Sequence, residues 1–265
     1  MNKKQISMVT FAMILANVMA GLDSTIINTA IPAIIADLHG IQFMGWIIAL
    51  MLLGMSVSTP IWSKLGEKIG NKAAFEISLV LFVLGSLFQG LAQNMYFFLI
   101  ARTVMGIGAG GMGSIPYIMA GFIFDNIKKR TQVLGYLGAS FSVAAIIGPL
   151  AGGYLVDSLS WHWVFYINIP IGLAAALLSV LYYREGQIDK EPKFDILGSF
   201  LVVVGLVLVL LGIQLVGLVS VWTIVGLIIA GIIILYFFFK HESHDSNPVI
   251  PIEMFKNKAL MGDLL

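Results

Sequence analysis

Residues 97–113 read FFLIARTVMGIGAGGMG, a hydrophobic segment that contains one charged residue, Arg102, and five glycines. An arginine at the centre of a bilayer costs roughly 2.5–3.5 kcal/mol on insertion scales, so it faces the protein interior or a watery cavity and finds a partner there. The glycines have no side chains and let a neighbouring helix backbone come close. The segment therefore predicts a membrane-spanning helix that combines a buried charge with a close-packed seam.

The whole chain has the composition of a polytopic membrane protein. Of its 265 residues, 59% are hydrophobic and 11% are charged, whereas an ordinary soluble domain has about 25% charged residues. The net charge is +1 and the basic residues form small clusters, so nothing indicates a nucleic-acid partner. Cysteine is absent, which excludes disulfides and thiolate metal sites. We expect an all-α protein in contact with the lipid bilayer.

Eight hydrophobic segments are long enough to cross a membrane, which takes about 20 residues. Short polar or glycine-containing breaks separate them. The predicted spans are residues 7–35, 41–62, 73–92, 95–122, 133–156, 163–183, 196–216 and 220–239. We expect four parts: a six-helix half (1–183), a cytoplasmic linker (184–195), two further transmembrane helices (196–239), and a cytoplasmic loop leading into a truncated ninth helix (240–265).

The basic residues predict the orientation, because short cytoplasmic loops retain Lys and Arg. With eight spans, 14 of the 15 basic residues fall on one side of the membrane, and the remaining one, Arg102, lies within it. The 14 residues are Lys3, Lys4, Lys64, Lys68, Lys72, Lys128, Lys129, Arg130, Arg184, Lys190, Lys193, Lys240, Lys256 and Lys258. We therefore expect a multi-pass protein of the cell membrane with a cytoplasmic N-terminus.

Asp23, in the first predicted helix, is a second charge inside the membrane. Counting the helical rise of about 1.5 Å per residue places it at a depth comparable to that of Arg102. We hypothesise that the two share a water-accessible cavity, paired directly or through water, and that they couple transport to protons. Thr25 and Asn28 would line a substrate cavity there. The alternative is that Asp23 only satisfies neighbouring backbone groups or hydroxyls.

Two patterns could suggest other chemistry. Residues 106–111 match G-x-G-x-x-G, but a dinucleotide site requires a strand before the motif, and these residues lie in the middle of a predicted membrane helix, so helix packing is the better interpretation. His241 and His244 are three residues apart in a charged loop, which favours a solvated loop over a metal site. No nucleophile and base stand in a catalytic pattern. We expect no enzyme, no cofactor and no metal.

Four motifs in order resemble the major facilitator superfamily, and within it the fourteen-helix drug/proton antiporter branch. The first-helix motif is LDSTIINTAIP at residues 22–32, and Arg102 with Gly106 and Gly108 resembles the fourth-helix motif. The fifth-helix antiporter motif is matched by GPLAGG at residues 148–153, and SWHWVFYINIPIG at 160–172 resembles a segment typical of the branch. The resemblance covers about residues 6–260 and implies the N-terminal six-helix bundle plus two linker helices.

The resemblance also implies roles for individual residues. In the superfamily the fourth-helix arginine is associated with proton coupling, which assigns that role to Arg102. The loop SKLGEKIGNK at residues 63–72 is similar to the gating loop, although it departs from the pattern at Ser63, Glu67 and Asn71. The residues assigned to gating are Glu67, Lys68, Gly70 and Lys72. Those assigned to helix packing and bending are Gly106, Gly108, Gly110, Gly148, Pro149, Gly152 and Gly153.

Three functions remain open. The first is a proton-coupled exporter of small amphipathic or drug-like molecules, present here as a truncated chain. Since the substrate site of such transporters lies between two repeats, a missing C-terminal half or a second copy would be a partner. The second is a non-transporting membrane remnant or an assembly partner of a transporter. The third, an intramembrane enzyme or a channel, has the weakest support because neither a catalytic set nor a repeated pore motif is present.

Overall fold

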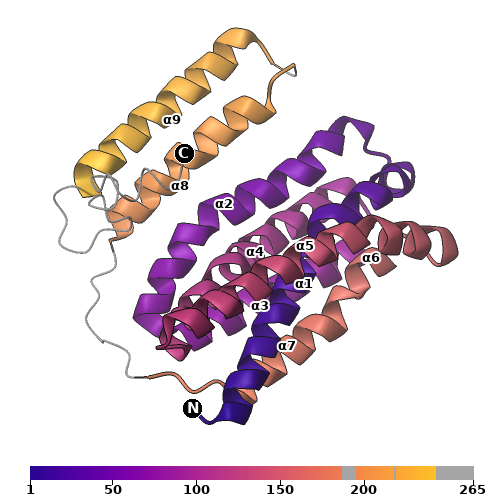
Figure 1. Ribbon diagram of the computed structural model, residues 1–265. Helices are drawn as coiled ribbons and strands as arrows, with labels where there is room; N and C mark the ends of the chain where they lie inside the picture. Colours follow the sequence, from indigo (N-terminus) through magenta and orange to yellow (C-terminus); the bar gives the residue numbers. More distant parts are fainter. Residues whose placement is uncertain (187–194, 218, 243–265) are drawn as a thin grey trace. The chain divides into compact units, whose positions relative to one another are not determined.

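The computed structural model describes residues 1–186, 195–217 and 219–242, and this part of the chain consists of helices joined by short connections, without strands. The chain forms two compact units, Met1–Ile188 and Asp189–Leu265. Within the described residues, eight helical stretches are long and apolar enough to cross a membrane, as predicted. The first unit contains α1 (Lys3–Leu38), the 3-10 turn η1 (Ile41–Phe43), α2 (Met44–Ile69), α3 (Asn71–Gly90), α4 (Met95–Ile123), α5 (Ile127–Ser158), α6 (Trp163–Tyr166) and α7 (Asn168–Tyr182), and the second contains α8 (Ile196–Gln214) and α9 (Val221–Glu242) (Figure 1).

Two helices begin earlier than predicted because asparagines cap them. In a capping box, Asn2 Oδ1 accepts the backbone N–H of Gln5 at 2.9 Å, and Gln5 Oε1 accepts that of Asn2 at 2.9 Å. The side chain of Asn126 likewise accepts the N–H of Lys129 at 3.3 Å. The basic residues expected in a loop before the fifth span therefore belong to the first turn of α5.

Three other predicted boundaries are wrong. Most of the expected gating loop is helical, because α2 continues to Ile69 and only Gly70 separates it from α3. Gly70 has a φ of +94°, a conformation that side-chain-bearing residues rarely adopt. The sixth span is divided at Ile167 into the short α6 and α7, and α9 extends to Glu242. The predicted ninth helix lies outside the described residues.

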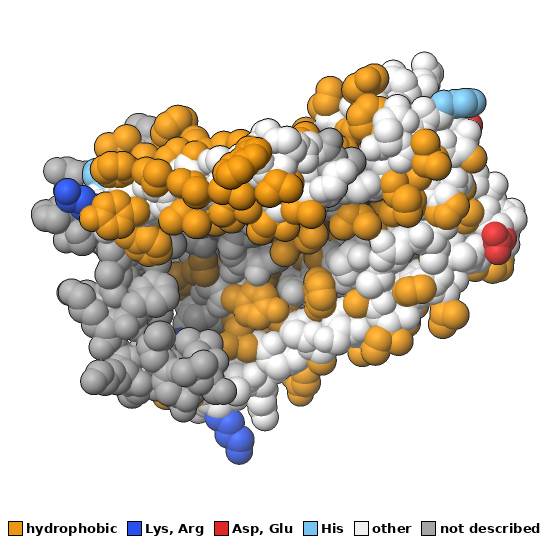
Figure 2. Space-filling model, turned by 90° about the horizontal axis from the view of Figure 1, so that it is seen from above, with side chains coloured by type: hydrophobic (Ala, Val, Ile, Leu, Met, Phe, Trp, Pro, Cys, Tyr) orange, Lys and Arg blue, Asp and Glu red, His pale blue; other side chains and the backbone are white. Residues whose placement is uncertain are grey.

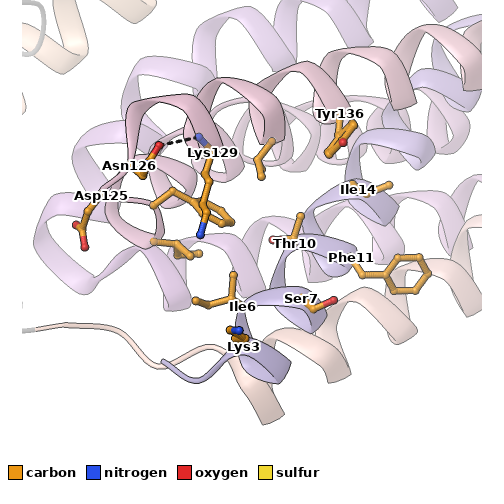
Figure 3. A pocket seen from close by; sticks show the side chains of 13 residues that line it. Lys3, Ile6, Ser7, Thr10, Phe11, Ile14, Asp125, Asn126, Lys129 and Tyr136 are labelled. Atoms are coloured by element: carbon orange, nitrogen blue, oxygen red, sulfur yellow. Dashed lines mark hydrogen bonds between the residues drawn. The ribbon is translucent and has the colours of Figure 1, made fainter.

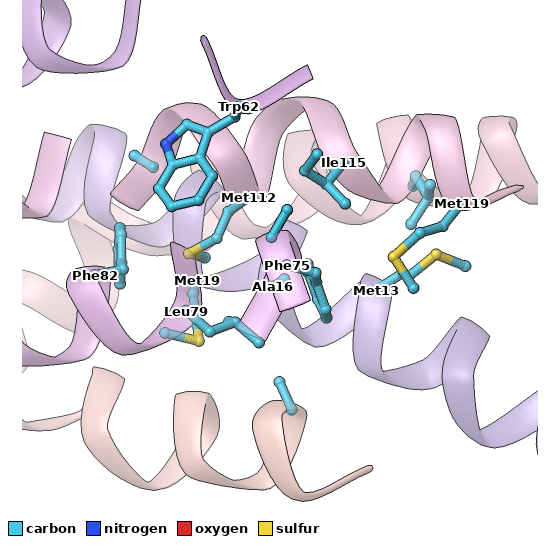
Figure 4. Packing of buried hydrophobic residues seen from close by; sticks show 14 of the residues in the cluster. Met13, Ala16, Met19, Trp62, Phe75, Leu79, Phe82, Met112, Ile115 and Met119 are labelled. Atoms are coloured by element: carbon cyan, nitrogen blue, oxygen red, sulfur yellow. The ribbon is translucent and has the colours of Figure 1, made fainter. Parts of the chain in front are cut away.

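The first unit is built around two central helices. α1 packs mainly against α5 and α7, and α4 packs mainly against α2 and α3 (Figure 1). Their contact surfaces form two apolar clusters, the larger of which is rich in methionine. Figure 4 shows Met13 and Met19 of α1 facing Met112 and Met119 of α4, with Phe75 among them. Unbranched thioether side chains fill irregular gaps between helices, which suits this core.

The outer surface of the helices is apolar, as a bilayer requires. On the face in Figure 2, hydrophobic side chains are spread over the surface, and the few visible Lys, Arg, Asp and Glu side chains lie near its margins. On α5, Ile146 and Leu150 are 74% and 77% exposed. In water such surfaces would favour aggregation, whereas in a membrane they meet lipid or another apolar protein surface.

The second unit is an antiparallel hairpin of α8 and α9 with a glycine-lined contact (Figure 1). A Cβ added at Gly231 would lie 2.9 Å from the carbonyl oxygen of Gly205. At the open end, Asp195 caps α8 by accepting the N–H of Gly198 at 2.8 Å, and it also contacts His241 Nε2 of α9 at 3.1 Å. One side chain therefore joins the first turn of α8 to the last turns of α9.

Candidate functional site

Arg102 and Asp23 form a buried ion pair between α4 and α1. Arg102 Nη1 lies 3.1 Å from Asp23 Oδ1 and 3.0 Å from Oδ2, and the side chains are 2% and 0% exposed. The predicted common depth of the two residues is confirmed. The expected water-accessible cavity is wrong for this conformation, because the surrounding helices exclude water from both groups.

The pair lies where the two apolar clusters of the first unit meet. On α1, Asp23 is flanked by Met19 of the methionine-rich cluster and by Ile26 of the second cluster. On α4, Arg102 is flanked in the same way by Met105 and Leu99. Each charge is thus surrounded by apolar side chains and depends on the other for compensation, so removal of one partner leaves an uncompensated buried charge.

Arg102 also bonds a third helix. Its Nε donates to the carbonyl oxygen of Ile47 on α2 at 3.1 Å, and its Nη1 lies 3.9 Å from the sulfur of Met105. Gln89 of α3 donates to the same sulfur at 2.8 Å. The sequence could not single out Ile47, because every residue carries a backbone carbonyl and only the close contact of α2 with α4 selects this one.

The glycines of α4 lie against the backbones of α2 and α3. A Cβ at Gly106 would stand 2.6 Å from the carbonyl oxygen of Met51, and one at Gly108 would stand 2.7 Å from that of Ser78. A Cβ at Gly110 would stand 2.7 Å from the carbonyl oxygen of Met55. Real side chains do not come so close, so these positions admit no side chain without a shift of the helices.

The glycines of α5 differ in how closely they approach α1. Cβ atoms at Gly148 and Gly152 would collide with the hydroxyls of Thr25 and Thr29 on α1. A Cβ at Gly153 would meet open space within the described part of the chain, and its predicted packing role stays a prediction. The helix runs without interruption through Pro149, and the predicted bending role of that residue stays a prediction.

The two residues assigned to a substrate cavity lie in different surroundings. Thr25 is half-buried in the contact between α1 and α5, and its hydroxyl donates to the carbonyl oxygen of Leu22 at 3.4 Å. Asn28 is exposed on the surface of the first unit. Their role in substrate binding stays a prediction.

The gating-loop residues make contacts within the first unit. Glu67 forms an exposed ion pair with Lys64 at 2.9 Å, and Lys68 is also exposed. Lys72 instead donates its Nζ to the carbonyl oxygens of Val180 and Tyr183 at 2.9 and 3.1 Å. It therefore binds the C-terminal end of α7, and a gating role for the loop stays a prediction. Among the described residues, no group of three or more His, Asp and Glu side chains could hold a metal ion.

Comparison with known proteins decides the family. The family model described as Major Facilitator Superfamily matches residues 13–245. The chain belongs to the Major Facilitator Superfamily. It is 34% identical over 255 residues to "Multidrug resistance protein 3" of Bacillus subtilis, covering 94% of this chain and 49% of that protein. It is 36% identical over 250 residues to "Multidrug transporter protein MdtP" of the same organism, covering 93% and 46%.

Solved structures show the same fold at low sequence identity. The POT family transporter PepTSo matches with a TM-score of 0.65 at 14% identity, covering 90% of this chain and 52% of that one. A D-xylose-proton symporter matches with a TM-score of 0.60 at 16% identity, covering 86% and 66%. The chain of this superfamily member spans about half the length of the curated relatives it matches.

Proposed function

We propose that this chain supplies the proton-coupling half of an exporter that moves small amphipathic or drug-like molecules out of the cell in exchange for protons. Its place is the cell membrane, with a cytoplasmic N-terminus. The observation that carries the proposal is the Asp23–Arg102 ion pair, closed off from water in the centre of the first unit. The Bacillus subtilis relatives, named for multidrug resistance and multidrug transport, support the substrate class.

The chemistry of the pair suits proton coupling. An ionised Asp23 accepts two hydrogen bonds from Arg102, whereas a protonated carboxyl has lost the charge that compensates the guanidinium. Arg102 must then remain buried without a counter-charge, at a cost of several kcal/mol, or move toward water. Proton binding at Asp23 is thereby linked to a change of contact between α1 and α4.

Arg102 can pass that change to α2. Its Nε bond to the Ile47 carbonyl connects the charged group to the backbone of α2, and the close contact of Gly106 with Met51 lies one turn away. A displacement of the guanidinium therefore disturbs two of the helices that surround it. In transporters of this architecture, two halves rock about a central site, so a second six-helix half or a second copy of the chain would complete the cycle.

The test is flux of a fluorescent amphipathic substrate in proteoliposomes that contain the chain, alone and with a matching C-terminal half. We expect an imposed pH gradient to drive efflux in the wild type, and Asp23→Asn to abolish the dependence on the gradient. Asp157→Asn removes an exposed carboxylate and is the matched control, which should behave as wild type. Retention of proton-driven flux by the Asp23→Asn variant would show that Asp23 does not bind the transported proton.

A further inference from the structure

A cavity of about 670 Å³ lies among the start of α1, the end of α4 and the start of α5 (Figure 3). Neither Asp23 nor Arg102 lines it, and none of its lining residues belongs to the motifs described above. The lining residues are Lys3, Ile6, Ser7, Thr10, Phe11, Ile14, Ile123, Phe124, Asp125, Asn126, Lys129, Val133 and Tyr136.

The lining changes from charged to apolar along the helix axes. Lys3 and Lys129 lie in the first turns of α1 and α5, at the ends of the membrane-spanning segments. Phe11 and Ile14 follow on α1, and Tyr136 follows on α5. From Lys3 to Ile14 the helical rise amounts to about 16 Å. The cavity therefore has a cationic end at the membrane surface and an apolar end at the level of the acyl chains.

The cationic end is uncompensated. Among the described residues, neither Lys3 nor Lys129 forms an ion pair. Figure 3 shows the Lys129 amine directed into the space between α5 and α1, while the carboxylate of Asp125 lies at the edge and is turned away from it. The site thus offers two cations to an anionic ligand.

We propose that this cavity binds an anionic phospholipid, with its phosphate between Lys3 and Lys129 and an acyl chain along Phe11, Ile14 and Tyr136. Basic pockets between transmembrane helices recognise anionic headgroups, and each nearby lysine strengthens the attraction. A free phosphate would use only the cationic end and would leave the apolar wall uncovered. The site is separate from the proposed proton-coupling pair, so the proposal stands independently of transport.

The test measures lipid binding to the purified, delipidated full chain by native mass spectrometry and by the shift of its thermal midpoint. The probes are phosphatidylglycerol, phosphatidylcholine with the same acyl chains, and inorganic phosphate. We expect retention of phosphatidylglycerol with a rise of the midpoint, and no comparable effect of the other two probes. An equal rise with inorganic phosphate would overturn the lipid assignment in favour of a phosphate site, and an equal rise with phosphatidylcholine would overturn the charge recognition.

Two pairs of substitutions separate a specific site from general surface charge. Lys3→Gln with Lys129→Gln should weaken phosphatidylglycerol binding about tenfold or more. Lys4→Gln with Lys128→Gln removes the same charge from adjacent exposed positions outside the cavity and should leave binding within about twofold of wild type. Ser7→Trp keeps every charge but fills the cavity, and it should also abolish retention. Equal losses in both lysine pairs, or full retention in Ser7→Trp, would overturn the proposal.

Discussion

Lys72 and Glu185 join the start of α3 to the end of α7 in both directions. The carboxylate of Glu185, which follows α7, accepts the backbone N–H groups of Asn71 and Lys72 at the start of α3, the latter at 3.3 Å from each oxygen. The ammonium of Lys72 in turn donates to two carbonyls at the end of α7. Gly70 stands at the N-cap of α3 without a side chain, so Glu185 provides the cap and the negative charge that favour a helix N-terminus.

Replacement of that cap should destabilise the bundle. We expect Glu185→Ala to lower the free energy of unfolding by about 1–2 kcal/mol, because it leaves N–H groups of α3 without acceptors. Glu185→Gln keeps an acceptor and should cost less. The measurement is the thermal midpoint in detergent, and Glu67→Ala is the control, since it removes only an exposed ion pair. Equal effects of Glu185→Ala and Glu67→Ala would contradict the capping role.

The ion pair should show strong coupling in a double-mutant cycle. Asp23→Asn and Arg102→Met should each destabilise the chain by about 3–5 kcal/mol, since each leaves one buried charge or polar group uncompensated. The double variant removes both charges and should be more stable than the sum of the two effects predicts. The cycle is measured by unfolding in detergent, and additive losses would mean that the two side chains do not interact.

Two glycines of α4, Gly108 and Gly113, provide a test of close helix packing and its control. Gly108→Ala places a methyl group against the backbone of Ser78 and Phe82 and should cost about 1–3 kcal/mol through overpacking. Gly113→Ala, on the same helix, meets open space and should be neutral or slightly stabilising. The measurement is the thermal midpoint of each variant relative to that of the wild type. Similar losses would show that helix flexibility, and not close contact, explains the glycines.

The cap of α8 can be tested locally. Asp195→Ala removes the acceptor of the Gly198 N–H and should increase hydrogen exchange in the first turn of α8 about fivefold, equivalent to about 1 kcal/mol. Asp195→Asn can still cap the helix and should stay near the wild-type rate. Hydrogen–deuterium exchange with mass spectrometry reads out this turn separately from the rest of the chain. An unchanged rate in Asp195→Ala would rule out the cap.

The sequence determined the membrane architecture because hydrocarbon allows few alternatives. A helix satisfies its own backbone hydrogen bonds, so runs of about 20 apolar residues predict spans directly, and the eight predicted spans are present in the structure. The predicted ends of these spans were less accurate. The caps at Asn2 and Asn126 extend helices into polar residues, where hydropathy alone carries no signal.

The sequence also selected Asp23 and Arg102, because a charge within an apolar segment needs a partner wherever it lies. Only the tertiary structure decided the rest of the site. It closed the pair off from water, selected the Ile47 carbonyl as a second acceptor, and left Gly153 in open space while Gly152 meets α1. These outcomes depend on which faces of separate helices meet, and such contacts between distant segments leave no local pattern in the chain.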